Sequence, residues 1–252
     1  MKVSEMNDNV LVIGASGTIA KAITRALLKE AKFQKIILIS RSYQKDFSDV
    51  PAIEQLQSDY STDNIMKIGA ALREKSLSFS KIFICNGLLH SDTIKPEKRL
   101  EDFNPDAFVE LLIANTLTPF NWLKSLLPVL QGTHKEVKAG RCQVVVFSAR
   151  VGSISDNSLG GWYSYRASKA ALNMLLKTTA IEFKRRVPQA DIIAFHPGTT
   201  DSHLSKPFQR NVQPEKLFEA DWVAQRLLDI LADYSPQEQP QFIDYKMEPI
   251  PW

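Results

Sequence analysis

Short apolar runs recur along the chain and alternate with longer segments of helical periodicity. The apolar runs are NVLVIGAS, KIILIS, KIFICNG, CQVVVFSA and DIIAFHPG. The segments between them place apolar residues three and four positions apart, as in residues 18–32, 64–76, 105–130 and 161–186. Strands that are apolar throughout are typical of a parallel sheet covered by helices on both faces. With right-handed crossovers, the pattern predicts an α/β fold, a Rossmann-type doubly wound parallel sheet of about seven strands.

No internal repeat, low-complexity tract or Pro/Gly-rich linker divides the sequence, so residues 1–252 are expected to form a single nucleotide-binding domain. One region breaks the alternation of strands and helices. Residues 199–220 are polar over most of their length and are punctuated by Pro207 and Pro214. Loops of this length in compact domains are usually lids or disordered segments, and we expect a substrate lid here.

Charge and cysteine content narrow the class of protein. The 31 basic and 28 acidic residues give a net charge of +3 and form no basic block, so no nucleic-acid surface is expected. No apolar run approaches the roughly 18 residues of a membrane span, and the N-terminus lacks the apolar stretch of a signal peptide. Cys85 and Cys142 are too few for a disulfide framework, and the four histidines have no metal-ligand spacing. We expect a soluble, cytoplasmic protein without a metal.

The sequence VLVIGASGTIAKAI places a glycine turn between the first predicted strand and the first predicted helix. Glycine lets the backbone approach a pyrophosphate, and the helix N-terminus that follows offers free N–H groups to the phosphates. The pattern G-x-x-G-x-x-A is weaker than a full glycine triplet, and a glycine turn without a ligand is the alternative. The predicted cofactor contacts in this turn are Gly14, Ser16, Gly17, Thr18 and Ile19.

The end of the second strand predicts which nicotinamide cofactor is bound. In dinucleotide-binding folds an acidic residue here accepts from the ribose 2′-hydroxyl, whereas an arginine pairs with a 2′-phosphate. The strand ends LISRS, with Arg41 and no carboxylate, which favours NADP over NAD; a solvated loop arginine is the alternative. The third strand ends QSDYS, where Asp59 can accept from the adenine amino group beside Tyr60. Aspartate is also a routine turn residue.

The stretch WYSYRASKAALN contains two tyrosines, and only one has a lysine one helical turn later. Lys169 follows Tyr165 by four residues, whereas Ala167 follows Tyr163. A carbonyl that receives hydride becomes an alkoxide and needs a proton, which a tyrosine can donate. An ammonium group on the same helix face stabilises the phenolate and lowers the phenol pKa. Tyr165 is therefore the predicted general acid/base, with Lys169 tuning its pKa.

The glycine turn, Asn115 in a mid-chain helix, Y-x-x-x-K and HPG follow one another in the order of the short-chain dehydrogenase/reductase family. The sequence resembles this family over essentially its whole length. Within it, SARVGSISDNSLGGWYSYRASKAALN, HPGTTDSHLSKPF and the ending EPIPW resemble the branch that contains the C-factor cell-signalling protein. The resemblance implies an NAD(P)H-dependent oxidoreductase that transfers a hydride between a nicotinamide cofactor and a carbonyl or alcohol. It also implies that Lys169 holds the nicotinamide ribose and that Asn115 kinks its helix and supports a proton relay.

One departure from the family pattern concerns the serine that orients the substrate. In FSARVGS this position is Ala149. Ser148 is expected to point to the opposite face of its strand, since side chains alternate along a strand. Ser153 lies beyond the strand and can turn toward the substrate from the loop. Ser148, Ser153 or neither is left to polarise the carbonyl.

A second departure lies at the end of the fourth strand, where the usual N-N-A-G becomes ICNG. Gly87 still lets the cofactor approach the backbone, while Asn86 stands outside the usual asparagine positions. After the HPG strand, the resemblance implies contacts with the nicotinamide end of the cofactor from Pro197, Gly198 and Thr200.

The remaining expectations concern substrate, partners and the alternative function. Trp162 and Phe208 favour a partly apolar small-molecule substrate. In the family, the long helices that carry Asn115 and Tyr165 commonly form a two-fold surface, so a homo-oligomer is expected, either a homodimer or a homotetramer. Because Ala149 removes the usual hydroxyl, a dinucleotide-binding sensor or cell-signalling protein with weak or absent catalysis is the alternative.

Overall fold

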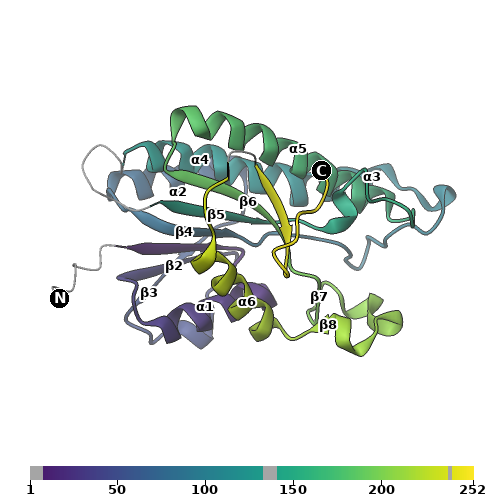
Figure 1. Ribbon diagram of the computed structural model, residues 1–252, viewed down its shortest axis with the longest axis horizontal. Coiled ribbons are helices and arrows are strands. Elements are labelled where there is room, and N and C mark those ends of the chain that lie inside the picture. Colours follow the sequence, from purple (N-terminus) through teal and green to yellow (C-terminus); the bar gives the residue numbers. More distant parts are fainter. Residues whose placement is uncertain (1–7, 133–140, 238–239) are drawn as a thin grey trace.

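The computed structural model describes residues 8–132, 141–237 and 240–252, and a seven-stranded parallel sheet forms its centre (Figure 1). The strand order is β3-β2-β1-β4-β5-β6-β9, and each neighbouring pair is parallel. The strands are β1 (Asn9–Ile13), β2 (Lys35–Ser40), β3 (Ile53–Gln57), β4 (Phe79–Ile84), β5 (Cys142–Phe147), β6 (Ala190–His196) and β9 (Gln241–Asp244). The predicted single-domain, doubly wound α/β fold is confirmed.

Helices cover both faces of this sheet (Figure 1). One layer contains α2 (Thr62–Glu74), α4 (Thr118–Gly132) and α5 (Tyr163–Arg186), and the other contains α1 (Thr18–Glu30) and α6 (Ala220–Asp233). Along β1, Leu11 and Ile13 join the core under the first layer, whereas Val10 and Val12 join the core under the second. Both faces of β1 are therefore buried, which explains why residues 10–13 are all apolar.

The strand order reverses between β1 and β4. The chain adds β2 and β3 on one side of β1, and β4, β5 and β6 on the other. The Cys85 N–H donates to the Ile13 carbonyl at 2.9 Å, so the turns after β1 and β4 begin side by side. In open α/β sheets, ligands bind outside the carboxyl ends of the strands at such a reversal.

The predicted helix over residues 105–130 is interrupted near its middle. It begins as α3 (Pro105–Leu112), passes through a π-helical turn at Ile113–Leu117, and continues as α4. Asn115 lies in this turn. A π-turn inserts one extra residue into a helix and is frequent at functional sites.

Residues 199–220 contain short regular elements. Two-residue strands, β7 (Thr199–Thr200) and β8 (Leu217–Phe218), pair in parallel. Two 3₁₀ turns, Lys206–Asn211 and Pro214–Lys216, lie between them. This segment leaves the sheet directly after β6 and so lies beside the carboxyl ends of the strands (Figure 1).

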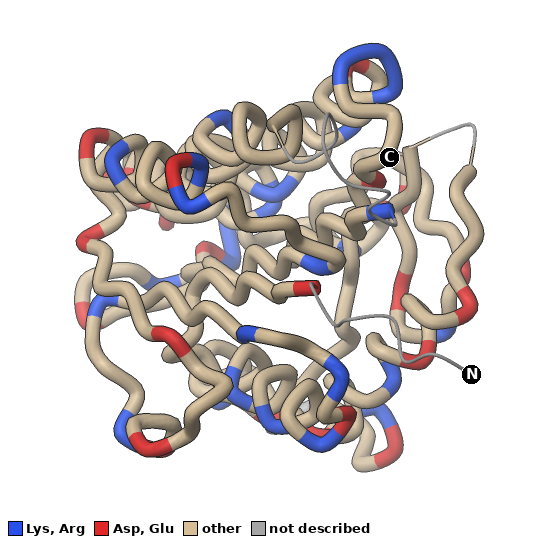
Figure 2. Tube along the Cα trace, turned by 90° about the vertical axis from the view of Figure 1, so that its left-hand side faces the viewer, with Lys and Arg blue, Asp and Glu red and all other residues tan. Residues whose placement is uncertain are grey.

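Charged residues of both signs are interspersed along the chain, and the central strands carry few of them (Figure 2). The sequence carries a net charge of +3, and its basic residues form no block. Among the described residues, no helix combines the length and apolar character needed to cross a bilayer.

Candidate active site

A cavity of about 280 Å³ opens where the carboxyl ends of β4, β5 and β6 meet the start of α5. Its lining has a polar part and an apolar part. The polar part includes Asn86, Gly87, Tyr165, Lys169 and Thr200. The apolar part, called the apolar wall, includes Leu89, Val151, Trp162, Leu204 and Phe208.

Tyr165 and Lys169 lie one turn apart on α5, and both are buried. The Lys169 Nζ lies 6.0 Å from the centre of the Tyr165 ring and donates a 3.0 Å hydrogen bond to the Phe147 carbonyl. Burial lowers the pKa of Lys169 to about 8 and raises the pKa of Tyr165 above its ordinary value. Desolvation of the phenol causes the raised pKa of Tyr165, and the lowering of this pKa by Lys169 stays a prediction. Tyr163 is 40% exposed and does not line the cavity.

Asn115 ties the turn after β4 to α5. Its side chain is fully buried, and its Oδ1 accepts from the Leu88 N–H at 2.7 Å. Its Nδ2 donates to the Leu88 carbonyl at 2.7 Å and to the Ser168 Oγ at 3.1 Å. Ser168 immediately precedes Lys169 on the helix. The π-turn thus aims one amide at two elements of the cavity wall and fixes them relative to each other.

The beginning of α5 is held by a residue that the sequence interpretation missed. Trp162, before the first turn, has a left-handed φ of 53° and gives no side-chain cap. Its N–H donates to the Glu97 carbonyl at 2.6 Å, and the buried Glu97 carboxylate accepts from both the N–H and the hydroxyl of Ser164. An anionic cap is favourable at a helix N-terminus. No local pattern links residues 67 positions apart in sequence, so only the fold reveals this contact.

The position of the family serine carries no hydroxyl, and neither candidate hydroxyl reaches it. Ala149 lines the cavity and packs against Tyr165. Ser148 borders the cavity, but its Oγ donates to the Asn173 Oδ1 of α5 at 2.5 Å. Ser153 lies outside the lining, and its Oγ accepts from the N–H of Asp156 at 3.2 Å. The alternation of side chains along β5 sends Ser148 to the helix side, as expected. The catalytic roles predicted for Ser148 and Ser153 are thus not supported by this geometry.

The glycine turn after β1 has the conformation that a phosphate-binding loop needs. Gly14 has a φ of 79°, and a Cβ there would lie 3.0 Å from a backbone nitrogen of the turn after β4. Glycine meets both requirements. Gly17 precedes α1 without a side-chain cap, so N–H groups in the first turn of α1 are left available for an anionic ligand. Ser16 is exposed beside them, and Ile19 lines the cavity.

Arg41 is exposed at the end of β2, and its guanidinium carbon lies 5.4 Å from the centre of the Tyr60 ring. The Tyr60 hydroxyl donates to the Ile39 carbonyl at 3.3 Å, and burial raises the pKa of Tyr60. The Asp59 Oδ1 accepts from the Ser61 N–H at 2.8 Å, and this bond lowers the pKa of Asp59. Asp59 therefore acts as a turn residue in this structure, and its contact with adenine stays a prediction.

Three buried polar atoms around the cavity have no hydrogen-bond partner within the described part of the chain. They are the Asn86 Oδ1, the His196 Nδ1 and the Thr200 Oγ1. Buried polar atoms in folded proteins are nearly always paired, so these atoms fit a ligand rich in amide and hydroxyl groups, such as a nicotinamide dinucleotide. Pro197 and Gly198 also line the cavity. Over the same described ranges, no cluster of three His, Cys, Asp or Glu side chains is placed to hold a metal ion.

Comparison with known proteins places this geometry in context. Residues 8–213 match the family described as short chain dehydrogenase. A 1-hydroxy-2-glutathionyl-2-methyl-3-butene dehydrogenase from Rhodococcus sp. (strain AD45) is 27% identical over 205 residues, 79% of this chain and 80% of the relative. The C-signal protein of Myxococcus xanthus is 27% identical over 140 residues, 55% of this chain and 74% of the relative. The NADPH-bound carbonyl reductase from chicken fatty liver has a TM-score of 0.83 at 20% identity and covers 100% of this chain and 97% of its own.

Proposed function

We propose that this chain, which belongs to the short-chain dehydrogenase family, is an oxidoreductase that reduces an apolar ketone or aldehyde with NADPH. The observation that carries the proposal is that Tyr165 and Lys169 are buried in one cavity with the glycine-containing turn after β4. Oxidation of NADPH in the presence of a panel of ketones and aldehydes tests it. We expect turnover with at least one apolar carbonyl compound.

The cofactor, when bound, supplies a hydride to the carbonyl carbon. Tyr165 donates its phenolic proton to the carbonyl oxygen as negative charge develops there, so that the product is the neutral alcohol. Lys169, in its ammonium form, stabilises the phenolate that Tyr165 leaves behind and helps return a proton to it. Asn115 holds the turn after β4 against α5, so the two groups keep their geometry during the reaction.

The cofactor preference is proposed to depend on Arg41. This residue follows β2, where the ribose 2′ position is read in dinucleotide-binding folds. Within the described residues, Arg41 has no carboxylate partner, whereas Lys21 nearby is paired with Asp46 at 3.1 Å. An unpaired guanidinium suits a phosphate, with which it forms bidentate bonds.

Replacement of Arg41 by alanine is expected to weaken NADPH binding by about 10- to 100-fold, because one charge-assisted interaction is lost. NADH binding should change by no more than about two-fold, since NADH has no 2′-phosphate. Fluorescence titration with each nucleotide measures both constants. Arg185→Ala, an exposed change at the far end of α5, is the control. Equal losses for both nucleotides would contradict the role of Arg41.

The apolar wall and residues 199–220 are proposed to form the substrate site and its lid. Phe208 from this segment contacts Trp162 with a ring separation of 5.1 Å, and Trp162 contacts Tyr165 at 6.2 Å. His90 packs edge-on against Phe208 at 5.7 Å. A carbonyl compound bound next to Tyr165 would therefore lie against aromatic and aliphatic side chains, which favours an apolar substrate.

The helices that carry Asn115 and Tyr165 are proposed to pair in a homo-oligomer. They expose large apolar side chains, which an oligomer interface would bury. These side chains are Val109, Ile113, Leu117, Met174 and Ile181.

The alternative function, a dinucleotide-binding sensor with weak turnover, is favoured by one observation. Ala149 occupies the place of the family serine, and the hydroxyls of Ser148 and Ser153 are bonded elsewhere. The resemblance to a cell-signalling branch belongs with this alternative. Under the proposed function, Tyr165 and the hydride donor act without a second hydroxyl.

Ala149→Ser is expected to raise kcat by about 2- to 10-fold, because a hydroxyl beside Tyr165 would add one hydrogen bond to the carbonyl oxygen. Ser153→Ala, which removes a hydroxyl outside the cavity, should leave kcat unchanged. Steady-state kinetics with the same ketone and thermal melting of each variant provide the measurement. A large loss of kcat in Ser153→Ala would instead show that Ser153 supplies the missing hydroxyl.

A further inference from the structure

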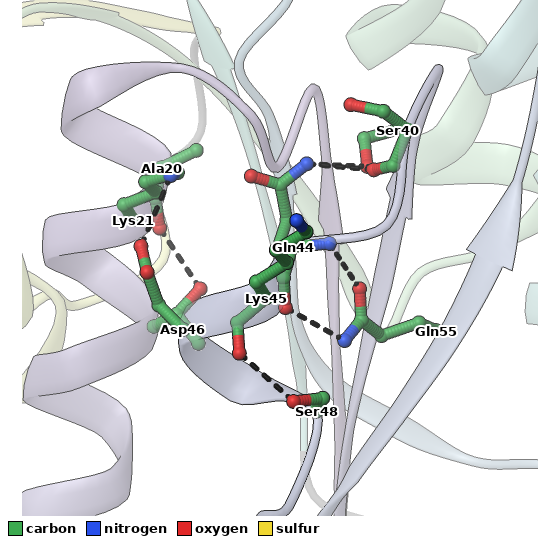
Figure 3. A network of polar contacts seen from close by, with 10 residues as sticks. Ala20, Lys21, Ser40, Gln44, Lys45, Asp46, Ser48 and Gln55 are labelled. Carbon is green, nitrogen blue, oxygen red and sulfur yellow. Dashed lines mark hydrogen bonds and ion pairs between the residues drawn. The ribbon is translucent and has the colours of Figure 1, made fainter.

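The turn that carries Arg41 is held from inside by side-chain amides (Figure 3). Gln44 is 4% exposed, and its Nε2 donates to the Ser42 carbonyl at 2.6 Å and to the Ser40 Oγ at 3.2 Å. The Ser40 hydroxyl donates to the same Ser42 carbonyl at 2.6 Å. A buried glutamine thus takes the place of regular backbone pairing in this turn.

A second amide comes from the neighbouring strand β3. The Gln55 Oε1 accepts from the Gln44 N–H at 2.7 Å, and the Gln55 Nε2 donates to the Gln44 carbonyl at 3.1 Å (Figure 3). Gln55 therefore pairs with the backbone of residue 44 as another strand would. From the end of β3, the Gln57 Nε2 donates to the Arg41 carbonyl at 2.8 Å.

The polar groups of this turn differ in whether they are hydrogen-bonded within the protein. The carbonyls of Arg41, Ser42 and Gln44 are all occupied by donors from the protein. The N–H groups of Ser42 and Tyr43 donate no hydrogen bond within the described residues, and both residues are exposed. The turn therefore offers two free N–H donors and a guanidinium, while three of its carbonyls are already bonded within the protein. Such an arrangement favours the binding of an anion.

The next turn of the chain is anchored as well. The 3₁₀ turn at Lys45–Phe47 is joined to α1 by the ion pair between Lys21 and Asp46, and the buried Phe47 holds it to the core (Figure 3). The segment that follows Arg41 is consequently fixed at both ends. Fixing a binding loop in advance reduces the entropy lost when the ligand is bound.

We infer that Gln44 and Gln55 are positioning residues that preform a cradle for the 2′-phosphate of the cofactor and so set the preference for NADPH over NADH. The inference rests on the proposed NADPH-dependent function. It goes beyond the role of Arg41, because it assigns the selectivity to two neutral amides that do not touch the phosphate. The amides act by bonding the carbonyls of Ser42 and Gln44, which leaves the N–H groups of Ser42 and Tyr43 free for the anion.

The test uses nucleotide fragments that differ only in this phosphate. Binding of 2′,5′-ADP and of 5′-AMP to the wild type, Gln44→Ala, Gln55→Ala and the control Gln34→Ala is measured by isothermal titration calorimetry. Gln34 is exposed before the opposite end of β2. We expect Gln44→Ala and Gln55→Ala each to weaken the binding of 2′,5′-ADP by about 10-fold, the effect of one to two hydrogen bonds. Their binding of 5′-AMP should change by no more than about two-fold. Gln34→Ala should bind both fragments as the wild type does, within about two-fold.

The outcomes separate the inference from the function on which it rests. Selective loss of 2′,5′-ADP binding supports the cradle. Equal weakening of the binding of both fragments, or no weakening, overturns the cradle. In that case, tight binding of NADPH by the wild type still supports the proposed function. Failure of the wild type to bind NADPH overturns both. Gln55 is only half-buried, so Gln55→Ala provides the test if Gln44→Ala does not fold, and thermal melting reports on folding.

Discussion

Replacement of Tyr165 by phenylalanine is expected to lower kcat for carbonyl reduction by about 100- to 10,000-fold, the range by which a positioned general acid accelerates proton transfer. The hydroxyl is the only group removed, and the ring still packs against Trp162 and Ala149. NADPH binding should therefore be retained. Because burial raises the pKa of Tyr165, the phenol of the wild type stays protonated at neutral pH and is ready to donate.

Tyr163→Phe provides a matched control on the same helix. This tyrosine lies two positions earlier, is 40% exposed and does not border the cavity. The kcat of Tyr163→Phe should equal that of the wild type. A Tyr165→Phe variant that retains full turnover, or a Tyr163→Phe variant that loses it, would show that the proton comes from elsewhere.

Replacement of Lys169 by methionine is expected to lower kcat/KM by about 100- to 1,000-fold, the loss typical of one preorganised donor at a reacting site. Methionine keeps the length of the side chain but removes the charge that stabilises the phenolate. In the wild type, burial lowers the pKa of Lys169 to about 8. The ammonium form dominates below that pH, so the rate of carbonyl reduction should fall as the pH rises through about 8.

The control for this change is Lys177→Met, two turns further along α5. The Lys177 ammonium lies over the Trp252 ring, away from the cavity. Lys177→Met should keep the wild-type rate of carbonyl reduction and the decline of that rate above about pH 8. The residual activity of Lys169→Met should lose that decline. Persistence of the same pH profile in Lys169→Met would assign the titration to another group.

The fold followed from the sequence because its signals are local and repeated. The strands β1, β2, β4, β5 and β6 are runs of five to seven residues that are mostly buried, and helical segments separate most of the strands along the chain. The glycine turn could be located for the same reason, since the left-handed φ of Gly14 excludes most other residue types. Tyr165 and Lys169 share a helix face by their spacing alone.

The contacts that complete the site could not be predicted, because they join distant segments. Ser148 and Ser153 were both candidates until the structure directed one hydroxyl to Asn173 and the other to a turn. The Glu97 cap and the amides of Gln44 and Gln55 have no sequence signature, since glutamate and glutamine on a chain usually mark solvated positions. The pKa of Tyr165 depends on total burial, which spacing along a helix does not reveal.

The most direct measurement of the central claim follows the hydride itself. The protein is incubated with NADPH in which both hydrogens at C4 of the nicotinamide are replaced by deuterium, together with a panel of apolar ketones and aldehydes. The alcohols are examined by mass spectrometry. With the wild type, we expect deuterium at the former carbonyl carbon. Tyr165→Phe should form at least about 100-fold less deuterated alcohol in the same time. Tight binding of NADPH without deuterium in any alcohol would contradict the account and identify the chain as a nucleotide-binding protein that does not catalyse reduction.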